Sequence, residues 1–185
     1  MQKQISKWLI VIATTILIAA LNVWFYHSFF LKKTFLFSWV LNFALFIWIS
    51  VAESQLNPAL KSAWYNSKPF EDKGRLYIKF GINLFRKFLV LIGWEKLTKA
   101  TNPVKNDIEA LQKYERATRT SEFNHIVVGL IVLAVTIYIS LAHGIEKTVW
   151  MIVLNILLNL YPVMLQRFNR PRLRAMLARH GVNSI

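Results

Sequence analysis

The stretch that decides the fold is Ile126–Leu165, which reads IVVGLIVLAVTIYISLAHGIEKTVWMIVLNILLNLYPVML. Within it, two apolar runs of equal length, Ile126–Ala142 and Val149–Leu165, flank the short turn His143–Thr148. Each run approaches the roughly 20 apolar residues that a membrane-spanning helix needs. The sequence therefore predicts an antiparallel pair of transmembrane helices in this part of the chain.

Polar clusters stand at the ends of the two runs that lie away from the turn. Glu122 and His125 precede the first run, and the segment Gln166–Arg172 (QRFNRPR) follows the second. Aligning the runs from the turn sets position 125 level with 166, and position 122 level with 169. Ionisable groups near hydrocarbon are costly and usually mark function. We therefore expect a carboxylate, an imidazole and several guanidiniums to meet at one membrane surface.

Composition places the rest of the chain in the membrane as well. Of the 185 residues, 55% are hydrophobic, more than an ordinary soluble domain carries. Two further runs, Trp8–Tyr26 and Thr34–Val51, come close to crossing length. The first run could instead be a cleaved signal peptide, but it is longer than a usual signal and lacks a clear small-residue cleavage site. We predict an all-α polytopic membrane protein, a single domain over residues 1–185 with four transmembrane helices.

The distribution of basic residues predicts the orientation. The net charge of +14 would suit a nucleic-acid-binding protein, but 20 of the 23 Lys and Arg side chains fall on one side of a four-crossing topology. We expect the protein in the inner (plasma) membrane. The positive-inside rule then puts both termini and the segment Ala52–His125 on the cytoplasmic side. We read the basic excess as contact with anionic lipids and possible phosphate binding, with no nucleic-acid partner.

The segment between the second and third spans is amphipathic in its central part. Pro69–Gly74 predicts a turn, and Tyr77–Trp94 is apolar with a narrow polar stripe made of Lys79, Asn83, Arg86 and Lys87. That pattern is typical of a helix lying in the membrane interface. A re-entrant or fifth crossing is the alternative, which three cations within the run disfavour. Asn102-Pro103 predicts the start of one long helix that continues into the third span, with Glu115 and Arg119 paired one turn apart.

Three kinds of chemistry fit Glu122 and His125. As Glu-x-x-His they put two ligands on one helical face, as in di-iron carboxylate bundles, but a second such motif and further carboxylates are missing. His125 could instead be a general base that takes a proton from a hydroxyl, with Glu122 as its partner. Glu122 could also form an ion pair with an arginine that only locks two helices together.

The missing residue types narrow the catalytic possibilities. There is no cysteine, which excludes disulfides, thiol nucleophiles and cysteine-ligated metals, and there is no Gly-x-Ser-x-Gly elbow. Direct transfer to an acceptor hydroxyl is therefore simpler than a covalent enzyme intermediate, and no cofactor or metal is expected. Arg167, Arg170 and Arg172 are suited to hold phosphate groups of an activated donor.

The segment Asn159–Leu173 (NLYPVMLQRFNRPRL) resembles the C-terminal signature of the glycosyl-diaponeurosporenoate acyltransferases, membrane enzymes that complete staphyloxanthin-type carotenoids. Phe168 stands where a Tyr is usual in that family. Upstream, Thr118 with Glu122–His125 and Phe70–Gly74 with Arg86-Lys87 resemble further family segments in the same order, over about residues 57–175. The N-terminal helices do not match in detail.

The resemblance implies transfer of a fatty acyl chain from a cytoplasmic donor, acyl-CoA or acyl-carrier protein, to a hydroxyl of a membrane glycolipid. The family acceptor is a glycosylated carotenoid. On this reading His125 is the base and Glu122 its partner. The expected donor-binding residues are Asn169, Arg170 and Arg172, supported by Gln166 and Arg167, with Thr118 and Glu71 as second-tier candidates. A non-enzymatic lipid-binding or partner protein, in which the same cluster is structural, is the alternative.

Overall fold

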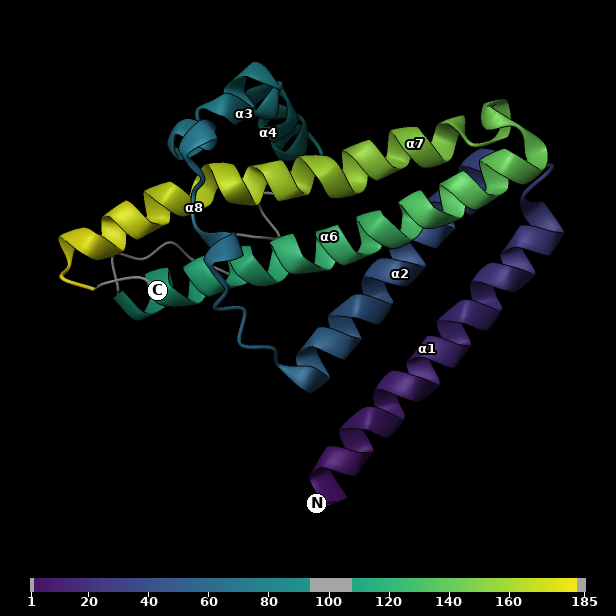
Figure 1. The fold of residues 1–185 in the computed structure, drawn as a ribbon, viewed down its shortest axis with the longest axis horizontal. Helices are drawn as coiled ribbons and strands as arrows, with labels where there is room; N and C mark the ends of the chain where they lie inside the picture. Colours follow the sequence, from purple (N-terminus) through teal and green to yellow (C-terminus); the bar gives the residue numbers. More distant parts are fainter. Residues whose placement is uncertain (1, 94–107, 183–185) are drawn as a thin grey trace. The chain divides into compact units, whose positions relative to one another are not determined.

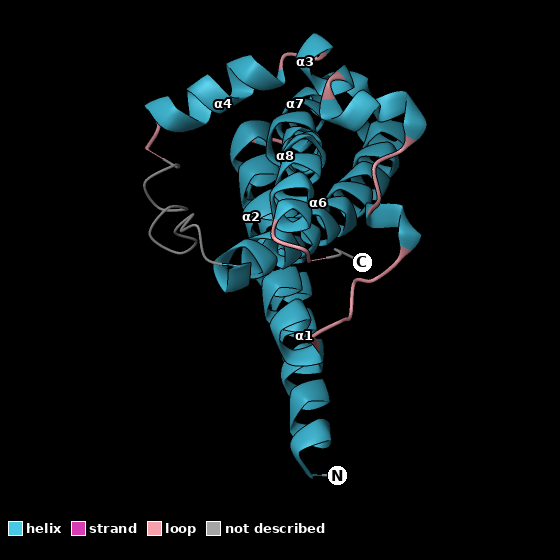
Figure 2. Ribbon diagram, turned by 90° about the vertical axis from the view of Figure 1, so that its left-hand side faces the viewer, coloured by secondary structure: helices cyan, strands magenta, loops and turns pink. Residues whose placement is uncertain are grey.

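The computed structural model describes residues 2–93 and 108–182, and every regular element in these two ranges is helical (Figure 1). The elements are α1 (Gln2–Phe29), α2 (Thr34–Leu56), η1 (Ala63–Tyr65), η2 (Pro69–Gly74), α3 (Leu76–Lys79), α4 (Ile82–Leu91), α6 (Ile108–His143), η3 (Ile145–Lys147), α7 (Val149–Asn155), η4 (Ile156–Leu160) and α8 (Tyr161–Arg179). Figure 2 shows them as helices joined by short loops. The predicted all-α class is confirmed.

Four helical stretches are long and apolar enough to cross a membrane. They are Gln4–Phe29, Thr34–Leu56, Ile108–His143 and Val149–Arg179. Each contains one of the four apolar runs read from the sequence, so the expected number and order of spans are confirmed. The most apolar window of α1 has none of its residues buried inside the protein. Such a surface suits contact with lipid, where a helix satisfies its own backbone and apolar side chains face hydrocarbon.

The chain divides into two compact units. The first unit comprises residues 1–59 and 123–160, and the second comprises residues 60–122 and 161–185. Helix α6 contributes residues to both, as does the continuous stretch α7–η4–α8. The first unit has one apolar core, made by Phe30, Phe37, Leu41, Ile49, Val128, Val132, Ile139 and Met151.

A π-helical turn, η4, interrupts the returning helix of the hairpin within the first unit. Two residues after η4, Pro162 has no backbone N–H, so the carbonyl of Leu158 cannot receive its ordinary hydrogen bond from position 162. Widened turns of this kind relieve such a mismatch and are frequent at functional sites. The buried residue Asn159 lies within this turn.

The second unit packs a loop and two short helices onto α8. One cluster, Tyr77, Ile82, Phe85 and Phe168, fixes α3 and α4 to α8, and a second, Leu111, Leu173 and Leu177, joins α6 to α8. The turn expected at Pro69–Gly74 is confirmed as the 3₁₀ segment η2. The long helix expected from Pro103 is described from Ile108 onward, and its beginning lies outside the described residues.

The single amphipathic helix expected over Tyr77–Trp94 is instead two helices. α3 ends at Lys79 and α4 begins at Ile82, because Gly81 between them has a left-handed backbone with φ of +79°. A glycine adopts that conformation at little cost, and it breaks the helical repeat. The polar stripe residues are nevertheless all exposed, as an interfacial helix requires. Trp94 lies outside the described residues.

Candidate functional site

Three buried carboxylates of the second unit face a row of arginines on α8. We call this set the Glu–Arg network: Glu71, Glu115, Glu122, Arg167, Arg170 and Arg174. The arginines recur at spacings of three and four residues, so they project from one face of α8. Glu122 and Glu115 lie on α6, and Glu71 lies in η2. The network therefore joins three elements of the second unit.

Glu122 is the centre of this network and has no exposed surface. Its Oε1 accepts hydrogen bonds from Arg167 Nε at 2.8 Å and from the indole nitrogen of Trp64 at 3.0 Å. Its Oε2 lies 2.5 Å from Arg170 Nη2. A fully buried carboxylate needs compensation of this kind, because removing its charge from water costs several kcal/mol. Both oxygens of Glu122 are therefore engaged by partners within the second unit.

Arg170 is buried and has a partner for each of its guanidinium nitrogens. Nε donates to the Thr118 hydroxyl at 3.0 Å, Nη2 donates to the Thr118 carbonyl at 3.0 Å, and Nη1 donates to the Tyr65 carbonyl at 3.2 Å. The guanidinium also lies 5.4 Å from the centre of the Tyr65 ring. Such full use of the planar donor set fixes its position, and lysine could not reproduce it.

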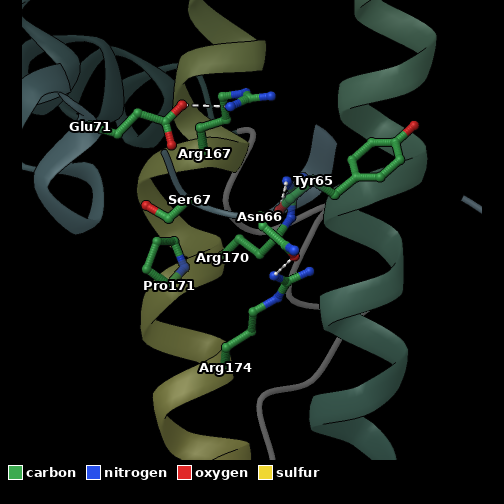
Figure 3. Close-up of a pocket in the computed structure, with 8 residues that line it drawn as sticks. All are labelled: Tyr65, Asn66, Ser67, Glu71, Arg167, Arg170, Pro171 and Arg174. Atoms are coloured by element: carbon green, nitrogen blue, oxygen red, sulfur yellow. Dashed lines mark hydrogen bonds and ion pairs between the residues drawn. The ribbon is translucent and has the colours of Figure 1, made fainter. Parts of the chain in front are cut away.

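Glu71 is held on the other side of Arg167. Its Oε1 accepts from Arg167 Nη1 and from the Tyr77 hydroxyl, and its Oε2 accepts from the backbone N–H of Lys68. Arg167 Nη2 donates to the Trp64 carbonyl at 3.1 Å, and the guanidinium lies 4.8 Å from the Trp64 ring. One guanidinium thus bridges two buried carboxylates, as Figure 3 shows for Glu71.

The η2 loop reaches α8 because Gly74 permits a very close approach. A Cβ at position 74 would lie 3.0 Å from the Phe168 Cα and 3.2 Å from the Phe168 carbonyl oxygen, and the φ of Gly74 is +92°. Asp72 and Lys73 also have positive φ values, of 44° and 51°. Left-handed non-glycine residues are strained and persist only where surrounding structure holds them. The Phe-Glu-Asp-Lys-Gly segment is thus shaped to deliver Glu71 to Arg167.

Glu115 forms the outer layer of the network. Its Oε1 pairs with Arg174 at 2.9 Å, and its Oε2 pairs with Arg119 at 2.8 Å, which confirms the predicted one-turn pair on α6. Arg119 also donates to the Leu60 carbonyl, and Arg174 donates to the Asn66 side chain. The backbone of residues 60–66 is therefore tied to α6 and α8 by guanidiniums.

A cavity of about 50 Å³ lies between the arginines of α8 and the loop that precedes η2. Its lining residues are those drawn in Figure 3: Tyr65, Asn66, Ser67, Glu71, Arg167, Arg170, Pro171 and Arg174. The volume suffices for water but not for a fatty acyl chain, because pockets for lipid-sized or drug-sized ligands are usually several times larger. Most of the residues that line it carry polar or charged side chains.

Burial and partners shift the acidity of groups around the cavity. Burial alone would raise the pKa of Glu71, but hydrogen bonds from Lys68, Tyr77 and Arg167 outweigh it and lower the pKa below its ordinary value. Burial, and then the hydrogen bond and negative charge of Glu71, raise the pKa of Tyr77. Burial, and then the negative charge of Glu122, raise the pKa of Tyr65. The Glu71 carboxylate therefore stays ionised, and the Tyr65 and Tyr77 phenols stay neutral.

His125, in the first unit, joins a chain of buried amides. Its Nδ1 lies 3.4 Å from the side-chain oxygen Oδ1 of Asn159. Asn159 donates to the side-chain oxygens of Asn42 and Asn155, at 2.7 and 2.9 Å, so its own oxygen is free to accept from the imidazole. The centres of the His125 and Phe46 rings lie 4.9 Å apart, with the two rings tilted by 33°.

The amide chain is anchored at both of its ends. Asn42 donates to the Ser38 carbonyl at 2.8 Å, and Asn155 donates across the hairpin to the Gly129 carbonyl at 3.1 Å. A Cβ at Gly129 would lie 3.3 Å from the Asn159 Cβ, which shows how closely the two helices approach there. Each amide orientation is thereby set by its neighbour, and the imidazole meets a fixed acceptor.

The predicted pairing of positions is only partly realised. Glu122 lies between Arg167 and Arg170, close to the predicted level of position 169. His125 lies 3.4 Å from the side-chain oxygen of Asn159, whereas the equal lengths of the two apolar runs had suggested position 166. Long arginine side chains reach back toward the N-terminus of their helix, which brings Arg170 to Glu122.

The remaining predicted residues have distinct surroundings. Thr118 accepts from Arg170, as described, and Arg172 stacks on Phe168. Gln166 and Asn169 are half-buried and make no side-chain hydrogen bond within the part of the chain that the structure describes. Sequence reasoning missed Trp64, Tyr65 and Tyr77, which lie on loops and short helices with no periodic signal. Asn159 was likewise not assigned to the site.

In the described ranges, no group of three or more His, Asp or Glu side chains is arranged to hold a metal ion. The buried carboxylates are already neutralised by guanidiniums. The arrangement is suited to two tasks: holding a rigid array of cations near one end of α6, and holding an imidazole in a defined orientation.

Comparison with known proteins gives one match. A sequence model of the glycosyl-4,4'-diaponeurosporenoate acyltransferase family matches residues 61–179, which is more than half of the chain. The matched range includes the entire Glu–Arg network, His125 and Asn159. No curated protein and no solved structure matches the chain. The expected family is thus confirmed, and the chain belongs to the glycosyl-4,4'-diaponeurosporenoate acyltransferase family.

Proposed function

We propose that this protein transfers a fatty acyl chain from a thioester donor in the cytoplasm to a hydroxyl group of a membrane glycolipid. The donor is acyl-CoA or acyl-carrier protein, and the acceptor is a glycosylated carotenoid, as the family name suggests. The observation that carries the proposal is the buried amide chain at His125, which orients an imidazole within an apolar unit. Metal-free acyl transfer to a hydroxyl needs such a base.

His125 acts as the general base in this reaction. The Nδ1–H of the ring points to the Asn159 side-chain oxygen, and Nε2 takes the proton of the acceptor hydroxyl. The hydroxyl oxygen attacks the thioester carbonyl carbon, the carbon–sulfur bond breaks, and the imidazolium returns the proton to the departing thiolate. Asn159 is a positioning residue that fixes the tautomer.

The Glu–Arg network fixes Arg167 and Arg170, the arginines that precede Arg172 on α8. Glu122 neutralises Arg167 and Arg170 and is thus a positioning residue, and it lies one helical turn before His125 on α6. Glu71 and Thr118 fix the same two arginines. Asn169 and Gln166, which have no partner within the described ranges, are available to bind the donor, and Arg172 holds its phosphate groups.

The membrane orientation completes the proposal. Both termini and the second unit lie on the cytoplasmic side of the inner (plasma) membrane, because 20 of the 23 Lys and Arg residues then face the cytoplasm. Cytoplasmic acyl donors reach the arginines directly, and anionic lipids contact the exposed basic stripe of α4. The acyl and carotenoid chains stay in the bilayer, since the 50 Å³ cavity cannot hold them.

The test is acyl transfer in cells that make the glycosylated acceptor and express the full chain, with lipid extracts analysed by mass spectrometry. His125→Ala is expected to abolish the acylated product while the amount of folded protein in detergent is unchanged. His180→Ala, an exposed histidine near the C-terminal end of α8, is the matched control and is expected to retain the product. Acylated glycolipid at the wild-type level with His125→Ala would overturn the assignment.

One observation favours a second candidate, a non-enzymatic lipid-binding or partner protein. Both oxygens of Glu122 and all nitrogens of Arg170 have partners within the protein, as expected of a purely structural lock. That candidate predicts that Arg170→Ala and Glu122→Ala lower the folded yield, and that His125→Ala leaves the lipid composition unchanged.

A further inference from the structure

Two arginines of the second unit, Arg86 on α4 and Arg172 on α8, approach one aromatic ring. The guanidinium carbon of Arg172 lies 3.7 Å from the centre of the Phe168 ring, and that of Arg86 lies 5.5 Å from the same centre. Phe168 is 3% exposed and packs in the core between α4 and α8, so its ring is a fixed platform. Cation–π contact with this platform is favourable for each guanidinium separately.

In the part of the chain that the structure describes, these two cations lack the counter-charge that their neighbours have. Arg167, Arg170 and Arg174 each contact a buried carboxylate. Neither Arg86 nor Arg172 forms an ion pair with a carboxylate within residues 2–93 and 108–182, and the two positive charges repel each other. Like charges brought together on one platform are unfavourable unless an anion joins them. Among the described residues, the pair is therefore a concentrated positive site without a carboxylate partner.

The geometry of the pair is built into the packing. Arg172 Nη1 donates to the Phe168 carbonyl at 2.8 Å, which folds its side chain onto its own helix. The position of α4 is fixed by Tyr161, whose ring stacks on Phe85 at 5.0 Å and whose hydroxyl donates to the Phe80 carbonyl at 3.1 Å. Both guanidiniums are thus held by rigid elements and still expose donors to solvent. Preorganised donors lose little entropy when they bind a ligand.

We propose that Arg86 and Arg172 together form a binding site for a phosphate group, and that in the proposed function this is a phosphate of the acyl donor. Guanidiniums bind phosphate oxygens through paired charge-assisted hydrogen bonds, which suits two arginines better than one. The arginines of the Glu–Arg network are neutralised by glutamates. The negative charge of the donor phosphate is therefore bound by Arg86 and Arg172. Only the identity of the ligand as the donor rests on the proposed function.

The experiment measures binding of inorganic pyrophosphate to the full chain in nanodiscs of phosphatidylcholine, by calorimetry at low salt. Arg86→Gln and Arg172→Gln are each expected to weaken binding about tenfold or more, which is the usual effect of losing one charge-assisted contact. Arg86→Lys keeps the charge but loses the paired donors, and should weaken binding less. The control is Lys87→Gln, the adjacent exposed cation on α4, which should bind as the wild type does.

Equal weakening in all three glutamine variants would show only a diffuse effect of net charge and would overturn the site. Because the altered side chains are exposed, we expect thermal melts to show that all the variants fold. Coenzyme A, whose phosphates are those of an acyl donor, should compete with pyrophosphate in the wild type. Nanodiscs containing phosphatidylglycerol separate the two sources of phosphate. Undiminished coenzyme A binding in these nanodiscs supports the acyl donor as the source of the phosphate. Displacement of coenzyme A by the lipid would assign the site to a lipid headgroup and overturn the donor assignment.

The two proposals fail separately. A chain that binds pyrophosphate through Arg86 and Arg172 but never transfers an acyl group would contradict the proposed function and leave the phosphate site in place. Acyl transfer that persists in both glutamine variants, with unchanged dependence on donor concentration, would overturn the assignment of the site to the donor and leave the proposed function.

Discussion

At Glu122, one carboxylate with no exposed surface faces the guanidiniums of Arg167 and Arg170. We expect Glu122→Gln to destabilise the folded protein by about 3–5 kcal/mol, because it leaves two buried cations without their shared counter-charge. The measurement is unfolding in a mild detergent, followed by tryptophan fluorescence. Asp72→Asn is the control, since Asp72 is 66% exposed and pairs with Arg75 only at 3.9 Å, which is worth about 1 kcal/mol or less. Equal stability of the two variants would contradict a buried network.

Glu71 gives the network a dependence on pH. Its folded pKa lies below the ordinary value of 4.5, so the folded protein favours the charged carboxylate more than the unfolded chain does. The stability contributed by Glu71 is therefore complete above pH 4.5 and is lost as the pH falls through the lowered folded pKa. Glu71→Gln should reduce the slope of stability against pH in that acidic range, measured by thermal melts at successive pH values. An unchanged slope would show that Glu71 does not titrate in this way.

Gly74 sets how closely η2 approaches α8. Gly74→Ala should destabilise the protein by more than about 1 kcal/mol, because the new Cβ meets the Phe168 backbone at 3.0 Å and φ is +92°. Gly93→Ala is the matched control: its φ is +76°, but nothing lies within 4 Å of its Cβ, so it reports the backbone cost alone. Melts of the two variants give the difference. A Gly74→Ala melt no lower than that of Gly93→Ala would argue against the loop–helix contact.

The elements were predictable to different degrees, for physical reasons. The four spans were evident, because a helix in hydrocarbon requires a long unbroken apolar run, and the partner of Arg119 followed from one-turn spacing on α6. The break at Gly81 was hidden, since a glycine inside an amphipathic pattern is compatible with either one helix or two. The partner of His125 was also missed, because alignment from the turn pointed to position 166, seven residues beyond Asn159.

The charged residues of the candidate site could be predicted from the sequence, whereas the aromatic residues that hydrogen-bond to them could not. The polar residues that flank the apolar runs, above all Glu122 and Arg170, were identifiable because a charge beside hydrocarbon is costly and usually marks function. Trp64, Tyr65 and Tyr77 were not identifiable, since their contribution arises from backbone carbonyls, an indole N–H and a hydroxyl that only the fold brings to Glu122, Arg170 and Glu71.

For the whole molecule, orientation in the membrane can be tested directly because the chain has no cysteine. Single variants Lys33→Cys and Lys147→Cys should react in intact cells with a maleimide that cannot cross membranes, since both loops lie outside under the positive-inside rule. Lys7→Cys and Arg179→Cys, near the two termini, should react only after the membrane is opened. Labelling of either terminal cysteine in intact cells would contradict the proposed topology.

The most direct measurement is acyl transfer by the purified full chain in nanodiscs, with a thioester donor and the glycosylated acceptor, followed by mass spectrometry in a single turnover. We predict that the wild type forms the ester, that His125→Ala is slower by about 10²–10⁴-fold at unchanged melting temperature, and that His180→Ala is as fast as the wild type. Ester formation by His125→Ala at the wild-type rate would contradict His125 as the base, and with it the mechanism proposed for this protein.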